Sequence, residues 1–244
     1  MYQFFVDDEQ VIAQKQIVIT GSDVNHIRNV LRMHGGEKVR ISDASGRGYF
    51  CHLEEVGDTE VLAAIDELDV TGTELKNHIV LFQGLPKGDK MELIIQKATE
   101  LGVAEIYPVA MKNCVVKLDD KKAASKVARW QSIAESAAKQ SKRTIIPKIQ
   151  MPLPWKRALE LAGTMDVKLV PYENARGMEA TREAIRSIQK GQSVAIFVGP
   201  EGGFAPEEIA LSEDFVRISL GRRILRTETA GLATLAMLVY ELEE

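Results

Sequence analysis

Hydrophobic and polar residues follow two different patterns along the chain. In residues 1–70 the apolar positions form short runs separated by turn residues, and evenly spaced short strands of this kind predict a small β-barrel. The expected strands are 2–6, 16–20, 38–42, 49–56 and 60–68. One helix is expected among them, from Asp23 to Met33, with Ser22 as its N-cap and Gly35-Gly36 after its end.

After the turn-rich segment 69–74 the pattern changes to strands that alternate with amphipathic helices. Apolar residues at Met91, Ile94, Ile95 and Ala98, for example, recur at the spacing of one helix face. The alternation predicts a mostly parallel sheet covered by helices, so we expect two domains, 1–70 and 71–244. The expected strands are 78–84, 104–109, 167–171, 194–198 and 216–220, and the expected helices are 89–101, 123–142, 155–162, 178–190 and 229–243.

Two of these strands run into glycine-containing turns, Gly199-Pro-Glu-Gly-Gly203 and Gly221-Arg-Arg-Ile-Leu-Arg226. In an open α/β sheet the ligand crevice lies at the carboxyl ends of the strands, and glycine lets a small molecule approach the backbone closely. Glu201 in the first turn, and the acidic Glu207 and Glu208 after it, disfavour a phosphate ligand. The turns therefore favour a ligand that is neutral or cationic where it contacts them.

The second turn mixes polar and apolar residues in the way a ligand pocket requires. The apolar pair Ile224-Leu225 is surrounded by arginines and by the run Arg226-Thr-Glu-Thr229. Thr227 and Thr229 are also suitable caps for the helix that follows. Both roles are compatible, so the sequence alone leaves them open.

Composition narrows the classes of protein. The chain has 244 residues, 45% hydrophobic and 27% charged, which is typical of a globular protein. No apolar run approaches the ~20 residues of a membrane helix, and the N-terminus has no signal-peptide pattern, so we expect a cytoplasmic location. Cys51 and Cys114 belong to no metal or disulfide pattern, and both are expected to be buried.

Several common chemistries lack their motifs. There is no glycine-rich dinucleotide or P-loop pattern after a strand, and no G-x-S-x-G nucleophile turn. All four histidines precede the glycine turns, which disfavours a hydrolase triad, and no metal-ligand spacing is present. We therefore expect no bound metal.

Charge is unevenly distributed. Residues 71–150 carry 14 Lys and Arg against 8 Asp and Glu, whereas residues 1–70 carry 6 against 13. Within 112–148, ten cations accompany three acids. This segment is either a solvated helix face or a nucleic-acid footprint. His26 shares an expected helix with Arg28 and Arg32, which form an exposed polar face or contact phosphates.

These motifs, taken in order, resemble the RsmE family, bacterial 16S rRNA (uracil-N3)-methyltransferases of the SPOUT superfamily. The resemblance covers the whole chain, although each piece is short. Two departures stand out: Asn113-Cys114 replaces a frequent Arg-Ser, and Gly221-Arg-Arg223 replaces a frequent Gly-Pro-Arg. The similar motifs are Gly199-Pro-Glu-Gly-Gly203, Leu220-Gly-Arg-Arg-Ile-Leu-Arg-Thr-Glu-Thr-Ala230, Lys87-Gly-Asp-Lys-Met91 with Gln96-Lys-Ala-Thr-Glu-Leu-Gly102, Arg129-Trp130-x-x-Ile133 with Gln140-Ser-x-Arg143, and His26-x-x-x-Val30-Leu31-Arg32.

The resemblance implies a PUA-like, RNA-binding β-barrel followed by an α/β domain with a mostly parallel sheet and a deep trefoil knot. It also implies a homodimer that binds S-adenosylmethionine (SAM) and acts on 16S rRNA within the small ribosomal subunit. SAM is a suitable ligand for the glycine turns, because it has no phosphate and its cationic groups tolerate Glu201. The residues implied to hold SAM are Pro171, Tyr172, Glu173, Val198, Gly199, Pro200, Glu201, Gly202, Gly203, Leu220, Gly221, Ile224, Leu225, Thr227 and Thr229.

Methylation at N3 of uracil requires loss of the N3 proton. Arg226 is the candidate for stabilising negative charge on the uracil oxygens, and either Glu228 or Glu201 is the candidate base. The alternatives are a SPOUT enzyme that methylates another position such as the ribose 2′-O, a non-catalytic rRNA-binding protein, and a general α/β ligand-binding protein. The candidate RNA-binding residues are His26, Arg28, Arg32, Lys87, Arg129, Lys142 and Arg143.

Overall fold

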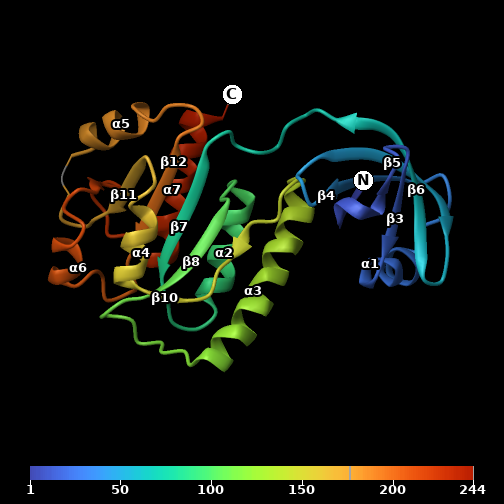
Figure 1. Cartoon of the computed structure of the whole chain (residues 1–244). Coiled ribbons are helices and arrows are strands. Elements are labelled where there is room, and N and C mark those ends of the chain that lie inside the picture. The colour runs from blue at the N-terminus through green and yellow to red at the C-terminus, as the bar shows by residue number, and fades with distance from the viewer. Residues whose placement is uncertain (176, 244) are drawn as a thin grey trace. The chain divides into compact units, whose positions relative to one another are not determined.

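The computed structural model describes residues 1–175 and 177–243. The chain divides into two compact units (Figure 1). The first holds Met1–Glu74 together with Ala138–Ile145, and the second holds Leu75–Ala137 and the described chain from Ile146 onward. Each unit has its own cluster of buried apolar side chains.

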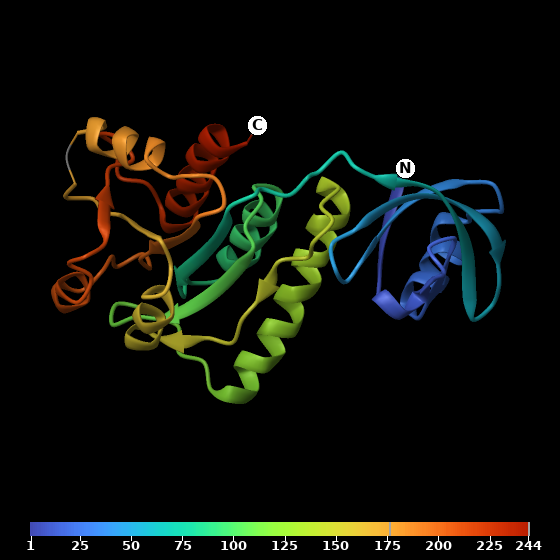
Figure 2. The same ribbon diagram turned by 45° about the horizontal axis from the view of Figure 1, so that its top comes forward.

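The first unit is built on a six-stranded sheet with the order β1-β4-β5-β6-β3-β2. The pairing of β1 with β4 is parallel and the other pairings are antiparallel. Burial alternates along β3 and in most of β5, whereas β4 is buried at five consecutive positions, and the strands curve around a short helical segment (Figure 2). The strands are β1 (Tyr2–Val6), β2 (Val11–Ile12), β3 (Gln16–Thr20), β4 (Lys38–Asp43), β5 (Gly48–Val56) and β6 (Glu60–Asp69), and η1 (Asp8–Gln10) is a 3-10 turn.

The helical segment of this unit differs from its expected form. It comprises α1 (Ser22–Asn25) and a wider π-helical stretch, η2 (His26–Leu31). Ser22 is the first helical residue rather than the N-cap, because Gly21 with φ +74° makes the turn into the helix. The helix ends at Arg32, whose φ of +54° is left-handed, and so it stops before the expected Met33.

The second unit contains a sheet whose pairings are all parallel, with the order β10-β8-β7-β12-β11-β13 and β9 beside β8. The central strands β7 and β12 are buried on both faces, which explains their continuous apolar sequences. The strands are β7 (His78–Gly84), β8 (Glu105–Ala110), β9 (Lys148–Ile149), β10 (Leu153–Pro154), β11 (Val167–Pro171), β12 (Ser193–Val198) and β13 (Val216–Ile218).

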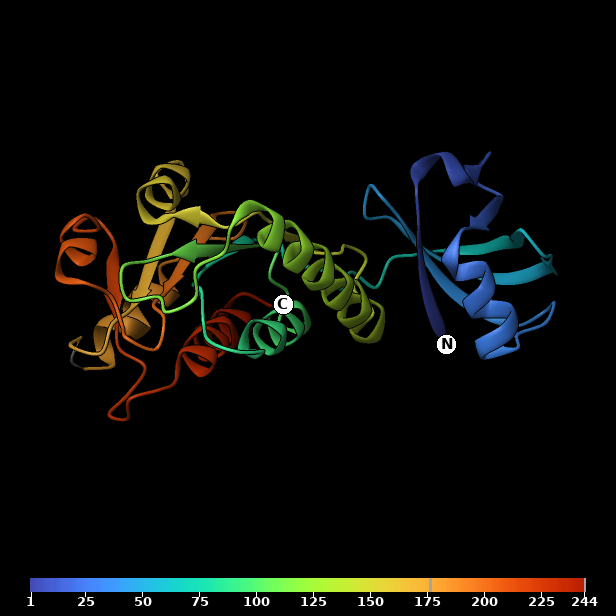
Figure 3. The ribbon, with the colours of Figure 1, turned by 90° about the horizontal axis from the view of Figure 1, so that it is seen from below.

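Helices cover both faces of this sheet. The helices α2 and α7 lie side by side on one face, and α4 lies on the other (Figure 3). The last helix begins at Thr227, two positions before the expected start, because extended Arg226 is its N-cap. The helices are α2 (Lys90–Glu100), α3 (Asp120–Ser141), α4 (Trp155–Ala162), α5 (Glu179–Arg186), α6 (Pro206–Ala210) and α7 (Thr227–Leu242).

Aromatic side chains pack together at the centre of the sheet beneath the glycine turns. The rings of Phe82 and Phe197, on adjacent strands, stack at a centroid distance of 4.4 Å, and Trp155 packs edge-on against Phe197 at 5.3 Å. Among the described residues, no helix is both long enough and apolar enough to cross a membrane. The trefoil knot stays a prediction.

Candidate active site

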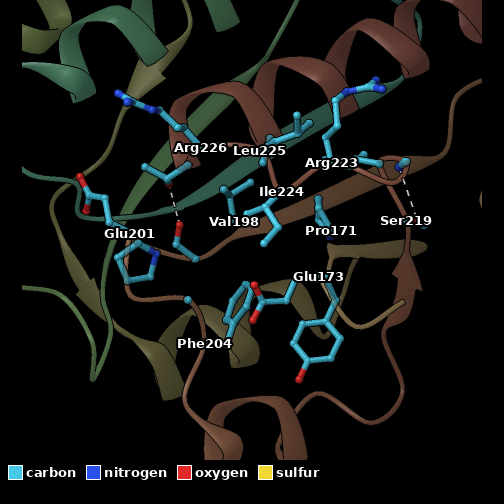
Figure 4. Close-up of a pocket in the computed structure, with 18 of the residues that line it drawn as sticks. Pro171, Glu173, Val198, Glu201, Phe204, Ser219, Arg223, Ile224, Leu225 and Arg226 are labelled. Atoms are coloured by element: carbon cyan, nitrogen blue, oxygen red, sulfur yellow. Dashed lines mark hydrogen bonds between the residues drawn. The ribbon is translucent and has the colours of Figure 1, made fainter. Parts of the chain in front are cut away.

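A cavity of about 500 Å³ opens at the carboxyl ends of β11, β12 and β13. This is the edge of a parallel sheet at which the fold class predicts a ligand site. Three loops form the walls: the loop that starts at Pro171, the loop Val198 to Phe204, and the loop Ser219 to Thr227 (Figure 4). Lys90 and Ala230 complete the lining.

The glycine loop after β12 needs its glycines for close backbone packing. A Cβ on Gly84, at the end of β7, would lie 2.7 Å from the backbone nitrogen of Pro200. A Cβ on Gly202 would lie 2.9 Å from the Cβ of Asn113. The Asn113 amide donates hydrogen bonds to the carbonyls of Gly202 and Gly203, at 3.0 and 3.2 Å. The loop is therefore held from two sides in one conformation.

Two hydrogen bonds in series, made by buried side chains, join three elements below the cavity. The Thr227 hydroxyl donates to the carbonyl of Gly199 at 2.6 Å, and the Gln83 amide donates to the Thr227 hydroxyl at 2.9 Å. Gln83 is at the end of β7, so this chain connects β7, the glycine loop and α7. Thr227 thus contacts the glycine loop instead of capping α7 through its side chain.

The loop between β13 and α7 presents apolar side chains to the cavity, with Ile224 the most exposed of them. Gly221 has φ +103°, a conformation that favours glycine. In Figure 4 the side chain of Ile224 points toward Glu173 and Phe204, whereas those of Arg223 and Arg226 point away from them. Ile224 is 86% exposed, so a ligand in the cavity would cover a large apolar surface.

Charged groups meet at the rim near the glycine loop. The Lys90 ammonium lies 2.8 Å from a Glu201 carboxylate oxygen and 3.6 Å from a Glu228 oxygen. Burial alone raises the pKa of Glu201, but hydrogen bonds from Lys90 and from backbone N–H groups outweigh it and leave that pKa lowered. The hydrogen bond to Glu201 raises the pKa of Lys90. Both groups are therefore charged at neutral pH.

The cavity brings together most of the residues predicted to hold a cofactor. Gly202 and Thr229 do not line it: Gly202 faces Asn113, and Thr229 is exposed on the first turn of α7. The sequence prediction omitted six lining residues. Lys90, Arg222, Arg223 and Ala230 lie inside quoted motifs, and Phe204 and Ser219 directly adjoin them, so the motifs marked these positions although no role was assigned to them. The omitted residues are Lys90, Phe204, Ser219, Arg222, Arg223 and Ala230.

The basic residues of 112–148 are largely engaged within the protein. Arg129 pairs with Glu92 at 2.8 Å, and Lys112 pairs with Glu207. Arg143 is 4% exposed and its guanidinium lies 2.5 Å from Glu74. Because the Arg143 side chain is buried and paired, it has a structural role, and we do not retain it as a proposed RNA contact.

The remaining candidate RNA-binding residues differ in their accessibility. The Lys142 ammonium donates to the carbonyls of Met1 and Lys139, at 2.8 and 3.4 Å, and burial lowers its pKa. Arg28 is exposed and pairs with Asp58. His26, Arg32 and Lys87 are exposed.

The described residues contain no group of three histidine, cysteine or acidic side chains placed to hold a metal ion. Cys51 and Cys114 are free thiols and are buried, as predicted. Burial raises the pKa of the Cys51 thiol to about 12. It also raises the pKa of the Cys114 thiol.

Two family models and several known proteins match the chain. An RNA methyltransferase domain matches residues 73–239, and an RNA methyltransferase PUA domain matches residues 19–66. Ribosomal RNA small subunit methyltransferase E of Bacillus subtilis is 37% identical over 100% of this chain and 98% of its own length. The same-named protein of Mesomycoplasma hyopneumoniae is 34% identical over 99% of this chain and 100% of its own length.

Solved structures show the same fold. A crystal structure described as a hypothetical protein has a TM-score of 0.91 at 36% identity, covering 99% of this chain and 98% of the other. Ribosomal RNA small subunit methyltransferase E of Neisseria gonorrhoeae, solved with bound S-adenosyl methionine, has a TM-score of 0.85 at 30% identity and covers 98% and 97%. With its PUA-like first unit, its parallel-sheet second unit and these relatives along its full length, the chain belongs to the RsmE family of RNA methyltransferases.

Proposed function

We propose that the protein transfers a methyl group from SAM to N3 of one uridine in the 16S rRNA of the small ribosomal subunit. The observation that carries the proposal is the cavity itself, which combines glycine-rich backbone, apolar walls and carboxylates. It occurs in a chain that is similar along its full length to ribosomal RNA small subunit methyltransferase E. Ribosomal RNA as substrate also implies a cytoplasmic location.

The residues present fit SAM. A volume of about 500 Å³ is within the usual range for a small-molecule site. Glu173 and Glu201 place negative charge where a cationic ligand would lie, and Val198, Ile224 and Leu225 supply apolar surface for an adenine ring. The loops would hold SAM mainly through backbone groups, since glycines bring the main chain to the cavity wall.

The chain's own residues then have three tasks. Bound SAM supplies a methyl group attached to a positively charged sulfur, which is a good leaving group. The loop from Ser219 to Thr227 lines the cavity and would cover bound SAM and exclude water, so that N3 and the methyl group would meet in one orientation. Arg226, 82% exposed at the rim, stabilises negative charge that develops on the uracil oxygens.

The rim also offers an RNA surface. Arg222 and Arg223 line the cavity and are exposed, and within the described chain neither has an ion-pair partner. Together with Lys87 they place positive charge beside the site, where phosphates of a splayed-out nucleotide would lie. We retain His26, Arg28, Arg32, Arg129 and Lys142 as proposed contacts at a greater distance along the RNA.

We further propose that the protein is a homodimer, as the family resemblance implies. Tyr240 on α7 and Leu93 on α2 are 87% and 44% exposed, and these two helices pack together. Their apolar exposure supports a partner surface on this side. Light scattering after size-exclusion chromatography should give a mass of two chains.

Methyl transfer from tritiated SAM to small subunits that lack the modification tests the function. We expect one methyl group per subunit, in a nucleoside whose mass spectrum places the methyl on the base at N3 of uridine. A ribose-methylated nucleoside would support the alternative SPOUT target. An absence of both transfer and calorimetric SAM binding would support a non-catalytic RNA-binding protein.

A further inference from the structure

One cation lies between the two carboxylates that are candidates for the base. Lys90 is the first residue of α2 and its side chain is 30% exposed. Its ammonium contacts Glu201, on the glycine loop, and Glu228, on the first turn of α7, at 2.8 and 3.6 Å. The two carboxylates therefore share Lys90 as a counter-ion.

Glu201 has little capacity left to accept a proton. Its Oε1 atom accepts a hydrogen bond from the Lys90 ammonium at 2.8 Å and another from the Lys87 backbone N–H at 3.1 Å. These donors stabilise the charged form of the carboxylate and fix its orientation. Glu201 therefore acts as an anchor between the glycine loop and the start of α2.

Glu228 is in the opposite situation. Its side chain is only 14% exposed and its Oε2 atom is buried, yet this atom accepts no hydrogen bond. Buried acceptors almost always have a hydrogen-bond donor, whereas this oxygen meets the Lys90 ammonium at 3.6 Å, beyond hydrogen-bond distance, and so calls for a functional explanation beside a ligand cavity. Its neighbours in sequence, Arg226 and Thr227, both line the cavity. The charged groups that face Glu228 are Lys90 on α2 and the Arg226 guanidinium, at 4.0 Å from Oε1.

We propose that Glu228 is the base that accepts the N3 proton of the target uridine. Lys90 is then a positioning residue that holds the Glu228 carboxylate in place and donates a hydrogen bond to Glu201. This inference rests on the proposed function. In the step, the N3 proton moves to the Glu228 carboxylate and the N3 electron pair forms a bond to the methyl carbon. The carbon–sulfur bond breaks, its electron pair stays on sulfur, and water later takes the proton from Glu228.

Replacement of Glu228 by glutamine tests the base directly. In single-turnover assays with small subunits, E228Q should react at least about 100-fold more slowly than the parent at neutral pH. Only ionised uracil would then react, so the E228Q rate should rise about tenfold per pH unit over roughly pH 6 to 9, while the parent rate stays flat. Calorimetric SAM affinity and the melting temperature should stay close to those of the parent. E183Q, at an exposed position of α5, is the matched control.

A substrate with a more acidic N3 proton supplies a second measurement. Subunits reconstituted with 5-fluorouridine in the rRNA should restore much of the E228Q rate, because the fluorine favours loss of the N3 proton. The parent rate should change little. A variant that merely misfolds would gain nothing from this substrate.

Replacement of Lys90 tests its positioning role. K90M removes the ammonium that both carboxylates contact, and because a nearby cation favours the charged form of a carboxylate, the acidic limb of the rate profile should move to higher pH. K90R should restore the parent profile in part. E201Q should weaken SAM binding and raise KM for SAM, but keep the parent's flat dependence of kcat on pH.

The outcomes separate this inference from the proposed function. If the parent methylates N3 of the uridine while E228Q keeps the parent rate and the flat profile, the assignment of Glu228 is overturned and the function stands. If E201Q instead of E228Q acquires the rising profile, the roles of the two carboxylates are reversed and the inference fails. A parent chain that modifies no uridine base would overturn both.

Discussion

At the residue scale, Gly84 shows how a position without a side chain shapes the site. An alanine Cβ there would lie 2.7 Å from the Pro200 nitrogen, and backbone atoms cannot yield as a flexible side chain does. We expect G84A to displace the glycine loop, to weaken SAM binding at least about tenfold and to cost about 1–3 kcal/mol of stability. Calorimetry with SAM and chemical denaturation measure the two effects.

Gly231 is the matched control for that substitution. A Cβ on Gly231, in α7, would meet its nearest atoms at 3.5 Å, an ordinary contact distance. Alanine is also the better helix former, so G231A should stabilise the protein by about 0.5–1 kcal/mol. Equal SAM affinities for G84A and G231A would show that the packing of Gly84 against Pro200 does not shape the site.

Asp43 gives the first unit a defined sensitivity to acid. Burial raises its pKa, but hydrogen bonds from Ser45, Tyr49 and Arg47 outweigh burial, and the pKa falls below its ordinary value of 3.8. A carboxyl whose pKa is lower in the folded state stabilises the fold above its unfolded pKa, and this stabilisation is lost as the pH falls toward the folded value. The first unit should therefore lose stability below about pH 4.

D43N tests this account. The amide keeps the shape of the side chain but removes the charge that five donor groups face, so we expect a loss of about 2–3 kcal/mol at pH 7. The variant should also lose less stability than the parent between roughly pH 5 and 3. Urea unfolding at several pH values gives both quantities. If the free energies of unfolding of D43N and the parent changed with pH in parallel, the role of Asp43 would be contradicted.

At the element scale, the segment after β8 supports the glycine loop. The Asn113 amide bonds two carbonyls of that loop, and the Lys112 backbone N–H donates to the buried Glu208 at 2.8 Å. Glu208 also accepts a hydrogen bond from the Ala205 N–H at the start of α6. The loop is thus fixed by an element distant in sequence rather than by its own residues alone.

N113A should loosen this support without unfolding the protein. Loss of both hydrogen bonds should cost about 1–3 kcal/mol, which corresponds to a roughly 5- to 150-fold weaker affinity for SAM if the loop must be ordered to bind it. K112A is the matched control, because the Lys112 side chain pairs with the exposed Glu207 and donates no hydrogen bond to the glycine loop among the described residues. Similar SAM affinities for N113A and K112A would exclude a role for the amide.

At the scale of the whole molecule, the sequence predicts local structure well and distant contacts poorly. The strands of both units follow from apolar alternation or apolar runs, and the glycine turns mark the cavity because glycine has a local conformational meaning. Lys90 and Gln83 escaped prediction because their roles depend on partners more than 100 positions away. The burial of Arg143 also depends on partners distant in sequence, and its local sequence is that of an ordinary surface cation.

The discontinuous first unit shows the consequence of such distant contacts. Its polar groups find partners in Ala138–Ile145: Arg40 donates to the carbonyl of Lys142, Gln3 donates to that of Arg143, and Glu74 accepts from the backbone N–H of Thr144 at 2.9 Å. Arg40 and Gln3 are each 4% exposed. A buried polar group that loses its partner costs about 1–3 kcal/mol, so residues 1–74 alone should be markedly less stable than in the intact chain.

Hydrogen exchange measures this difference strand by strand. In a fragment of residues 1–74, amides of β4 and β5 should exchange at least about tenfold faster than in the full chain, because opening of the sheet leaves fewer hydrogen bonds to break. A second fragment, with residues 138–145 attached after residue 74 through a flexible linker, should recover part of the protection. If the short fragment is protected as well as the intact chain, the later segment is dispensable and the first unit is complete in the N-terminal residues alone.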